Sequence, residues 1–254
     1  MKPKSIIVFL VALASLMQLA YSRTPDPEAD LSGPSGEIIG KYLEATNNES
    51  ELGRSASMEV DINASVPKLQ ENGRLHARRF ISRFGRISYR VLGFQGSNTV
   101  KSQVIGRYLQ AEQQGQANPK MAITPTNYKF RWKGARMTDN GADVYVFALV
   151  PRKRGEGLFK GEIWLDAQSY LPVYEKGRLV KNPSIFFKKV DFERAFAIQG
   201  GHSIPARMNS VITTRLVGKV ELDVNYSNFS EMREEEPERR TSAVISPSGY
   251  SSSQ

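Results

Sequence analysis

Residues 58–66 have the sequence MEVDINASV, in which apolar and polar side chains alternate without a break. This is the period of a β-strand that turns one face to a core and the other to water. The same period returns at residues 128–133 and at residues 219–226, in distant parts of the chain. Three such strands predict an antiparallel sheet with one apolar face.

Further strands are expected at residues 75–83, 86–94, 143–150, 158–166, 170–174, 178–180, 185–198 and 203–217, with a turn at 175–177. Two segments have apolar side chains at helical spacing instead. Residues 37–45 predict a short helix, and residues 99–114 predict a helix that lies on the sheet. Because consecutive strands joined by tight turns form a meander, the expected fold class is mainly β (α+β), a curved antiparallel sheet wide enough to curl.

The two ends of the chain differ in composition from the middle. Lys2 and Lys4, an apolar run at 6–16 and the small residues around Ser22 indicate a signal peptide at 1–22, cleaved after Ser22. An uncleaved N-terminal anchor is the alternative. We expect a flexible lead-in at 23–35, one folded domain at 36–230, and a disordered tail rich in Glu, Arg and Ser at 231–254.

The chain contains no cysteine. This excludes a disulfide framework, thiol catalysis and cysteine-ligated metal. An exported protein of 254 residues without a disulfide is typical of a bacterial envelope, so we expect a periplasmic location.

The formal net charge is +9, and without Lys2 and Lys4 the remaining 33 basic and 26 acidic side chains leave +7. Export argues against a nucleic acid partner and favours an anionic membrane surface or an acidic envelope protein. Six arginines on two adjacent expected strands form a candidate basic patch, and an ordinary solvated outer face is the more common explanation for such residues. They are Arg74, Arg78, Arg79, Arg83, Arg86 and Arg90.

Few residues point to catalysis. His76 and His202 are the only histidines, and Ser203 is only a sequence neighbour of His202. The glycine-rich segment 155–161 enters a strand, so it predicts a hairpin turn and not a phosphate loop. Carboxylates on several strands leave glycosidase chemistry open as a minor alternative. We therefore expect no enzyme, no cofactor and no metal site.

Residues 159–173, FKGEIWLDAQSYLPV, resemble the lipoprotein-carrier superfamily of LolA and LolB. There too a strand ends in an acidic residue and turns through a short loop into a Leu-Pro step. The order of a signal peptide, a short helix, strands, an inserted helix and a closing strand at 219–229 extends the resemblance over 36–230. It implies an unclosed β-barrel with helices over its open side, an apolar cavity for acyl chains, and no covalent chemistry. LolB-type members carry a lipid anchor on a cysteine, which this chain lacks.

On this resemblance the partner is a lipid or an acylated lipoprotein, and the alternating apolar residues are the candidate cavity wall. The wall would be formed by Met58, Val60, Ile62, Ile87, Tyr89, Val91, Phe130, Trp132, Phe147 and Ile163, and the lid by Ile105, Tyr108 and Leu109. Core packing is the alternative explanation for each of them. A second functional interpretation is an envelope sensor or adaptor with a filled core, which binds protein partners through its basic faces. The oligomeric state stays open.

Overall fold

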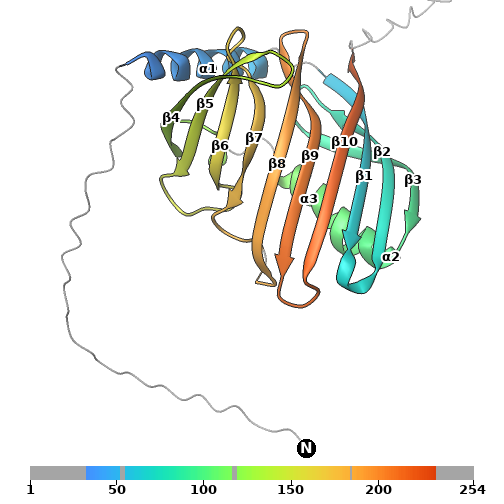
Figure 1. Cartoon of the computed structure of the whole chain (residues 1–254). Coiled ribbons are helices and arrows are strands. Elements are labelled where there is room, and N and C mark those ends of the chain that lie inside the picture. The colour runs from blue at the N-terminus through green and yellow to red at the C-terminus, as the bar shows by residue number, and fades with distance from the viewer. Residues whose placement is uncertain (1–32, 52–54, 116–118, 184, 233–254) are drawn as a thin grey trace, which may run out of the picture.

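The computed structural model describes residues 33–51, 55–115, 119–183 and 185–232 (Figure 1). The expected signal peptide, nearly all of the expected lead-in, and residues 233–254 of the expected tail lie outside the described residues. None of the helices in the described ranges is both long enough and apolar enough to cross a bilayer.

Ten strands form one antiparallel sheet in the order β3-β2-β1-β10-β9-β8-β7-β6-β5-β4, so β3 and β4 are its two edges and the sheet does not close. The strands are β1 Ser55–Val66, β2 Glu71–Ile81, β3 Ile87–Gly96, β4 Tyr128–Met137, β5 Asp143–Pro151, β6 Phe159–Asp166, β7 Pro172–Leu179, β8 Phe187–Gln199, β9 His202–Thr214 and β10 Lys219–Met232. The expected fold class is confirmed. The alternation in β1 is the clearest case, since its side chains from Ala56 to Val66 are buried at every second position.

The helices cover one face of this sheet. α1 Pro34–Glu51 lies across the β4–β7 part. A second helical stretch consists of α2 Asn98–Val100, one π turn (η2, Lys101–Ile105) and α3 Gly106–Gly115, and lies behind β10, β1 and β2 in Figure 1. We call residues 98–115 the lid segment. A short 3₁₀ turn, η1 Pro67–Leu69, joins β1 to β2.

Strand register shows that both helical parts sit on the same face. One cross-strand row joins, in order, Ile62, Val224, Met208, Arg194, Glu175, Ile163 and Phe147. Residues opposite each other in a ladder point to the same side of a sheet. The row begins in the cluster under the lid segment and ends in the cluster under α1. We call this side the inner face and the opposite side the outer face.

Three expected boundaries differ from the structure. α1 is longer than the expected helix at 37–45 and begins at Pro34, and β10 runs to Met232, past the expected start of the tail. The expected turn at 175–177 is wrong, because β7 continues through it. Gly177 pairs with Gly161 of β6, and a Cβ on Gly177 would overlap the ring of Phe159. Gly177 therefore makes room for a buried ring and does not turn the chain.

A substitution at Gly161 tests whether the backbones of β6 and β7 approach closely at this pair of glycines. A Cβ there would overlap the carbonyl oxygen of Lys176 and lie 2.6 Å from the Cα of Gly177. We expect Gly161→Ala to lower the free energy of unfolding in urea by about 1–3 kcal/mol, the usual cost of overpacking. Gly93→Ala in β3, where a Cβ would meet nothing within 4 Å, is the control. Equal stability of the two variants would contradict the close approach.

Candidate functional site

The lid segment closes the apolar inner face of β1, β2 and β10. Val100 and Ile105 are 1% and 0% exposed and lie in the same cluster as Met58, Val60 and Ile62. Further lid side chains, at positions 104, 108 and 109, pack against this cluster and are partly buried. Ser97 caps the start of the segment, because its Oγ accepts a hydrogen bond from the Val100 N–H at 3.4 Å.

A polar cluster lies within this apolar contact and ties the lid segment to three strands. Its five residues, which we call the lid latch, are Arg79 of β2, Tyr89 of β3, Tyr108 and Glu112 of α3, and Tyr226 of β10. The Tyr89 hydroxyl donates to Oε2 of Glu112, and the Tyr226 hydroxyl donates to its Oε1 at 3.3 Å. Nε of Arg79 lies 3.6 Å from Oε2 of Glu112, and the hydroxyls of Tyr108 and Tyr226 are 2.8 Å apart. One carboxylate on the lid thus gathers groups from three strands.

Burial sets the electrostatics of the latch. Arg79 is 6% exposed, and its Nε has no hydrogen-bond partner among the described residues. Burial disfavours its charge, but the Glu112 carboxylate and the hydroxyls of Tyr89 and Tyr226 together outweigh this, so the pKa of Arg79 is raised. Burial also raises the pKa of Tyr89 and of Tyr108, and it raises the pKa of Tyr226 to about 12. The latch is thus an Arg79–Glu112 ion pair with a buried guanidinium and a carboxylate that is 24% exposed, surrounded by phenols.

The place of Arg79 corrects the expected basic patch. Leu75 and Ala77 are buried at alternate positions before Arg79, so the same alternation turns Arg79 inward. Arg74 and Arg78 do point outward, but Nη2 of each lies near a β1 carboxylate, at 3.6 and 3.2 Å. The patch is therefore smaller and less positive than the sequence indicated. Glu112 was not among the site residues expected from the sequence. Its only signal there is its position four residues after Tyr108, on the same side of a helix.

The candidate wall residues fall into two groups. Met58, Val60, Ile62 and Ile105 are buried in the lid cluster, with Tyr89, Tyr108 and Leu109 packed against it. Phe130, Phe147 and Ile163 are buried under α1 together with Ile39 and Tyr42. Ile87 is buried, whereas Val91 and Trp132, on the two edge strands, are 50% and 45% exposed.

An ion pair separates these two groups in the middle of the inner face. Glu175 is 7% exposed, and its Oε2 lies 3.6 Å from Nη1 of Arg194, whose side chain is 48% exposed. Burial raises the pKa of Glu175, and the charge and hydrogen bond of Arg194 only partly oppose it. The inner face is therefore polar at its centre and apolar at both ends.

Replacing Glu175 by glutamine should raise the unfolding temperature at pH 7. Because the folded-state pKa is raised above the unfolded value of about 4.3, the natural protein gains stability as the pH falls through the raised pKa. Glutamine has no charge to bury, so its advantage should shrink as the pH approaches 4. Thermal unfolding at pH 7 and at about pH 4 measures this, with Glu44→Gln on an exposed part of α1 as control. A less stable Glu175→Gln at pH 7 would contradict it.

Each of the two histidines lies near a carboxylate, and the Ser203 hydroxyl bonds to the backbone. Nδ1 of His76 lies 3.3 Å from Oδ1 of Asp61, and Nε2 of His202 lies 3.7 Å from Oε1 of Glu231. The Ser203 hydroxyl donates to the carbonyl oxygen of Pro172 at 2.6 Å. Across the described ranges, no three His, Asp or Glu side chains come together in a way that could hold a metal ion.

No family model matches the sequence, and no curated protein matches it. The chain does match several solved structures. The chain is similar to a LolA superfamily protein from Nitrosomonas europaea, at 14% identity and a TM-score of 0.39 over 77% of this chain and 94% of that one. It is similar to a putative outer membrane lipoprotein-sorting protein domain from Vibrio parahaemolyticus, at 12% identity and a TM-score of 0.44 over 80% and 95%.

A third match is a chain of the Pseudomonas aeruginosa MucA/MucB complex, at 13% identity and a TM-score of 0.24 over 76% of this chain and 99% of that one. The matches include the superfamily that the sequence resembles. With identities below 25% and TM-scores below 0.5, this likeness concerns the fold and carries nothing about a ligand or a partner.

Proposed function

We propose that this chain is a non-catalytic carrier of the bacterial periplasm that holds an acyl chain of a lipid or lipoprotein between the inner face of β1, β2 and β10 and the lid segment. The observation that supports this most is the lid latch. An apolar face and a helix that covers it permanently need no polar groups between them, yet here the buried Arg79 guanidinium and Glu112 hold the helix.

The energetics of the latch favour a lid that opens. Removing two charges from water costs several kcal/mol per ion, and their attraction barely offsets this unless further hydrogen bonds assist. The hydroxyls of Tyr89 and Tyr226 supply such bonds to Glu112. This closure is polar and directional, so it can be exchanged for water when the helix lifts, while the apolar side chains beneath it become available to a ligand.

An acyl chain suits the surface that is exposed in this way. Its burial is worth about 0.8 kcal/mol per methylene and requires no hydrogen bonds. A chain of about sixteen carbons gains roughly 10 kcal/mol before the costs of ordering are subtracted. Met58, Val60 and Ile62 would contact the chain from the sheet, and Ile105 and Leu109 from the lid.

Titration of the full chain with cis-parinaric acid, a fluorescent fatty acid, tests the proposal. We expect saturable binding of one probe per protein with micromolar or tighter affinity, and competition by palmitate. A Cys-free periplasmic protein of another fold, treated identically, is the control. Absence of saturable binding after removal of endogenous lipid would contradict the proposed function.

A further inference from the structure

The outer face of the sheet carries a broad groove, on the side opposite the lid segment. Its volume is about 1320 Å³, and its lining extends from Arg131 on β4 to Val211 on β9. One cross-strand row forms its middle and joins Arg131, Ala148, Glu162, Lys176, Glu193 and Asn209. Adjacent strands lie about 4.8 Å apart, so the groove crosses about 24 Å of sheet.

The lining of the groove is strongly basic. It contains seven lysines and arginines and three acids, a surplus of four positive charges. Two of the acids already hold basic partners. Nζ of Lys176 lies 3.3 Å from Oε2 of Glu162, whose Oε1 binds Lys133, and Nε of Arg178 donates to Oδ1 of Asp191 at 2.7 Å.

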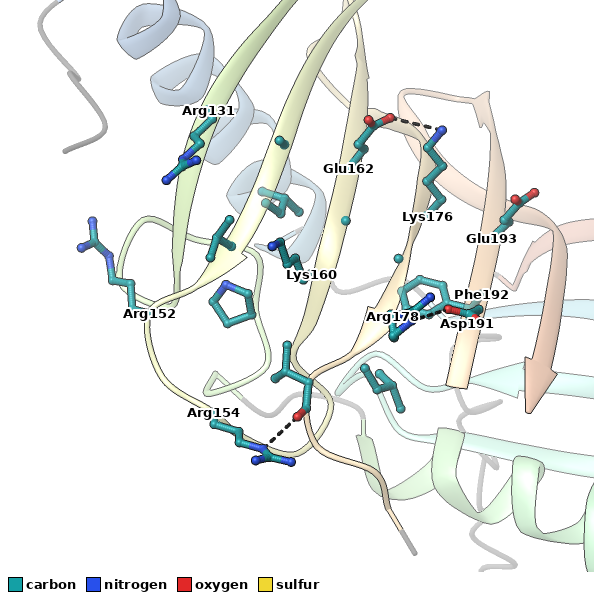
Figure 2. Close-up of a pocket in the computed structure, with 18 of the residues that line it drawn as sticks. Arg131, Arg152, Arg154, Lys160, Glu162, Lys176, Arg178, Asp191, Phe192 and Glu193 are labelled. Atoms are coloured by element: carbon teal, nitrogen blue, oxygen red, sulfur yellow. Dashed lines mark hydrogen bonds and ion pairs between the residues drawn. The ribbon is translucent and has the colours of Figure 1, made fainter. Parts of the chain in front are cut away.

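These ion pairs lie over β6–β8, as Figure 2 shows, so the surplus positive charge lies over the 152–154 loop and β6. Glu162 in the middle row stays ionised. Partial burial works to raise the pKa of Glu162, but hydrogen bonds from Lys133 and Trp164 and the charge of Lys176 hold it at about 2.

The other basic residues of the lining lie mainly in the 152–154 loop and on β6, in Arg152, Lys153, Arg154 and Lys160. Backbone carbonyl groups position both arginines of the loop. Nε of Arg152 donates to the Pro125 oxygen at 2.7 Å, and Nε of Arg154 donates to the Val180 oxygen at 2.9 Å. Each of these bonds uses one of the five N–H donors of its guanidinium, so the fork of Nη groups is oriented for carboxylates.

The volume and the lining of the groove indicate which kind of anionic ligand fits. Its volume exceeds the roughly 300–1,000 Å³ of small-molecule pockets. A flat membrane surface meets charges that protrude, whereas these charges line a recess together with apolar side chains, among them Ala148, Val150 and Val211. An extended peptide advances about 3.3 Å per residue, so about seven residues span the groove. The side chains of such a peptide that face the sheet can reach both apolar and basic residues of the lining.

We propose that this groove docks an extended, acidic and partly apolar segment of a partner polypeptide. Its carboxylates contact the basic residues of the 152–154 loop and β6, and its apolar side chains contact the apolar lining residues of β5 and β9. The groove and the lid segment lie on opposite faces, so the docking does not depend on acyl-chain binding.

Fluorescence anisotropy of a labelled ten-residue peptide of alternating Glu and Leu, titrated with the full chain, tests this. We expect the double variant Lys153→Glu/Lys160→Glu, both at exposed positions, to weaken binding by at least about tenfold. The control is Arg107→Glu/Lys219→Glu, which makes the same charge change at exposed positions outside the groove and leaves binding within about twofold. The same peptide with Gln in place of Glu should not bind.

Each of the following results would overturn the proposal. Equal affinity of the two double variants would show that attraction to the acidic peptide is general and not placed in the groove. Absence of binding by the natural protein at about 50 mM salt would show that the groove does not take acidic peptide. Capture of the protein by phosphatidylglycerol vesicles, lost in the groove variant while no peptide binds, would assign the surface to a membrane. Retained cis-parinaric acid binding in the groove variant separates this outcome from failure of the proposed carrier function.

Discussion

Replacing Glu112 by alanine should lower the free energy of unfolding by about 3 kcal/mol. The change leaves the buried Arg79 guanidinium without its carboxylate, and removal of one partner of a buried ion pair typically costs about 3–5 kcal/mol. The lower value applies because the Glu112 side chain is 24% exposed, so water can reach part of the space that it vacates. Urea denaturation followed by circular dichroism measures the loss.

Two further variants test whether the lost stability comes from the unpaired Arg79 charge. Arg79→Met combined with Glu112→Leu removes both charges and should recover most of the lost stability, since apolar replacement of a buried pair is often neutral or stabilising. Glu44→Ala removes an exposed carboxylate of α1 and should stay within about 0.5 kcal/mol. If Glu112→Ala costs no more than Glu44→Ala, the latch does not hold the lid segment.

Replacing Val104 by aspartate should weaken binding of cis-parinaric acid by about 100-fold or more. Val104 packs from the lid segment against the apolar cluster of β1, β2 and β10. A carboxylate at this position would face the acyl chain in a closed lid, where an unpaired charge is strongly disfavoured. The sheet does not depend on this side chain for its strand pairing, so the variant should retain its strand signal in circular dichroism.

Arg107→Asp is the matched control, because Arg107 lies on the same segment and is exposed. It should bind the probe within about threefold of the natural protein. A folded Val104→Asp variant with unchanged affinity would show that the acyl chain does not lie under the lid segment.

The strands were the most predictable part of the molecule. Alternation is a local signal, and β1 follows it over its whole length. The failure at 175–177 has a local cause as well, because a glycine that admits a neighbouring ring has the same sequence signature as a glycine that turns the chain. Only the pairing of Gly177 with Gly161, sixteen residues away, separates the two cases.

The candidate site was predictable only in part, because a period of two assigns a side chain to a face and not to a neighbour. The inward direction of Arg79 follows from the buried positions before it in β2. Its contact with Glu112 depends on where the lid segment docks, which no local pattern contains. The division of the apolar residues between two helical covers likewise follows from the order of ten strands in space.

The outer groove had only one sequence signal, the cluster of basic residues at 152–154. Its lining comes from six neighbouring strands, β4 to β9, and its basic residues lie up to 47 positions apart in the sequence, from Arg131 to Arg178. Pairing in the folded sheet then neutralises part of that charge, as with Arg178 and Asp191.

Mass spectrometry of organic extracts tests the central claim most directly. The full chain would be produced in a bacterial periplasm and purified without detergent, beside Val104→Asp and a control protein. We predict a phospholipid or another acylated species in near-stoichiometric amount from the natural protein and little from the variant. Extracts free of acylated species from a natural protein that also fails to bind cis-parinaric acid would contradict the carrier function.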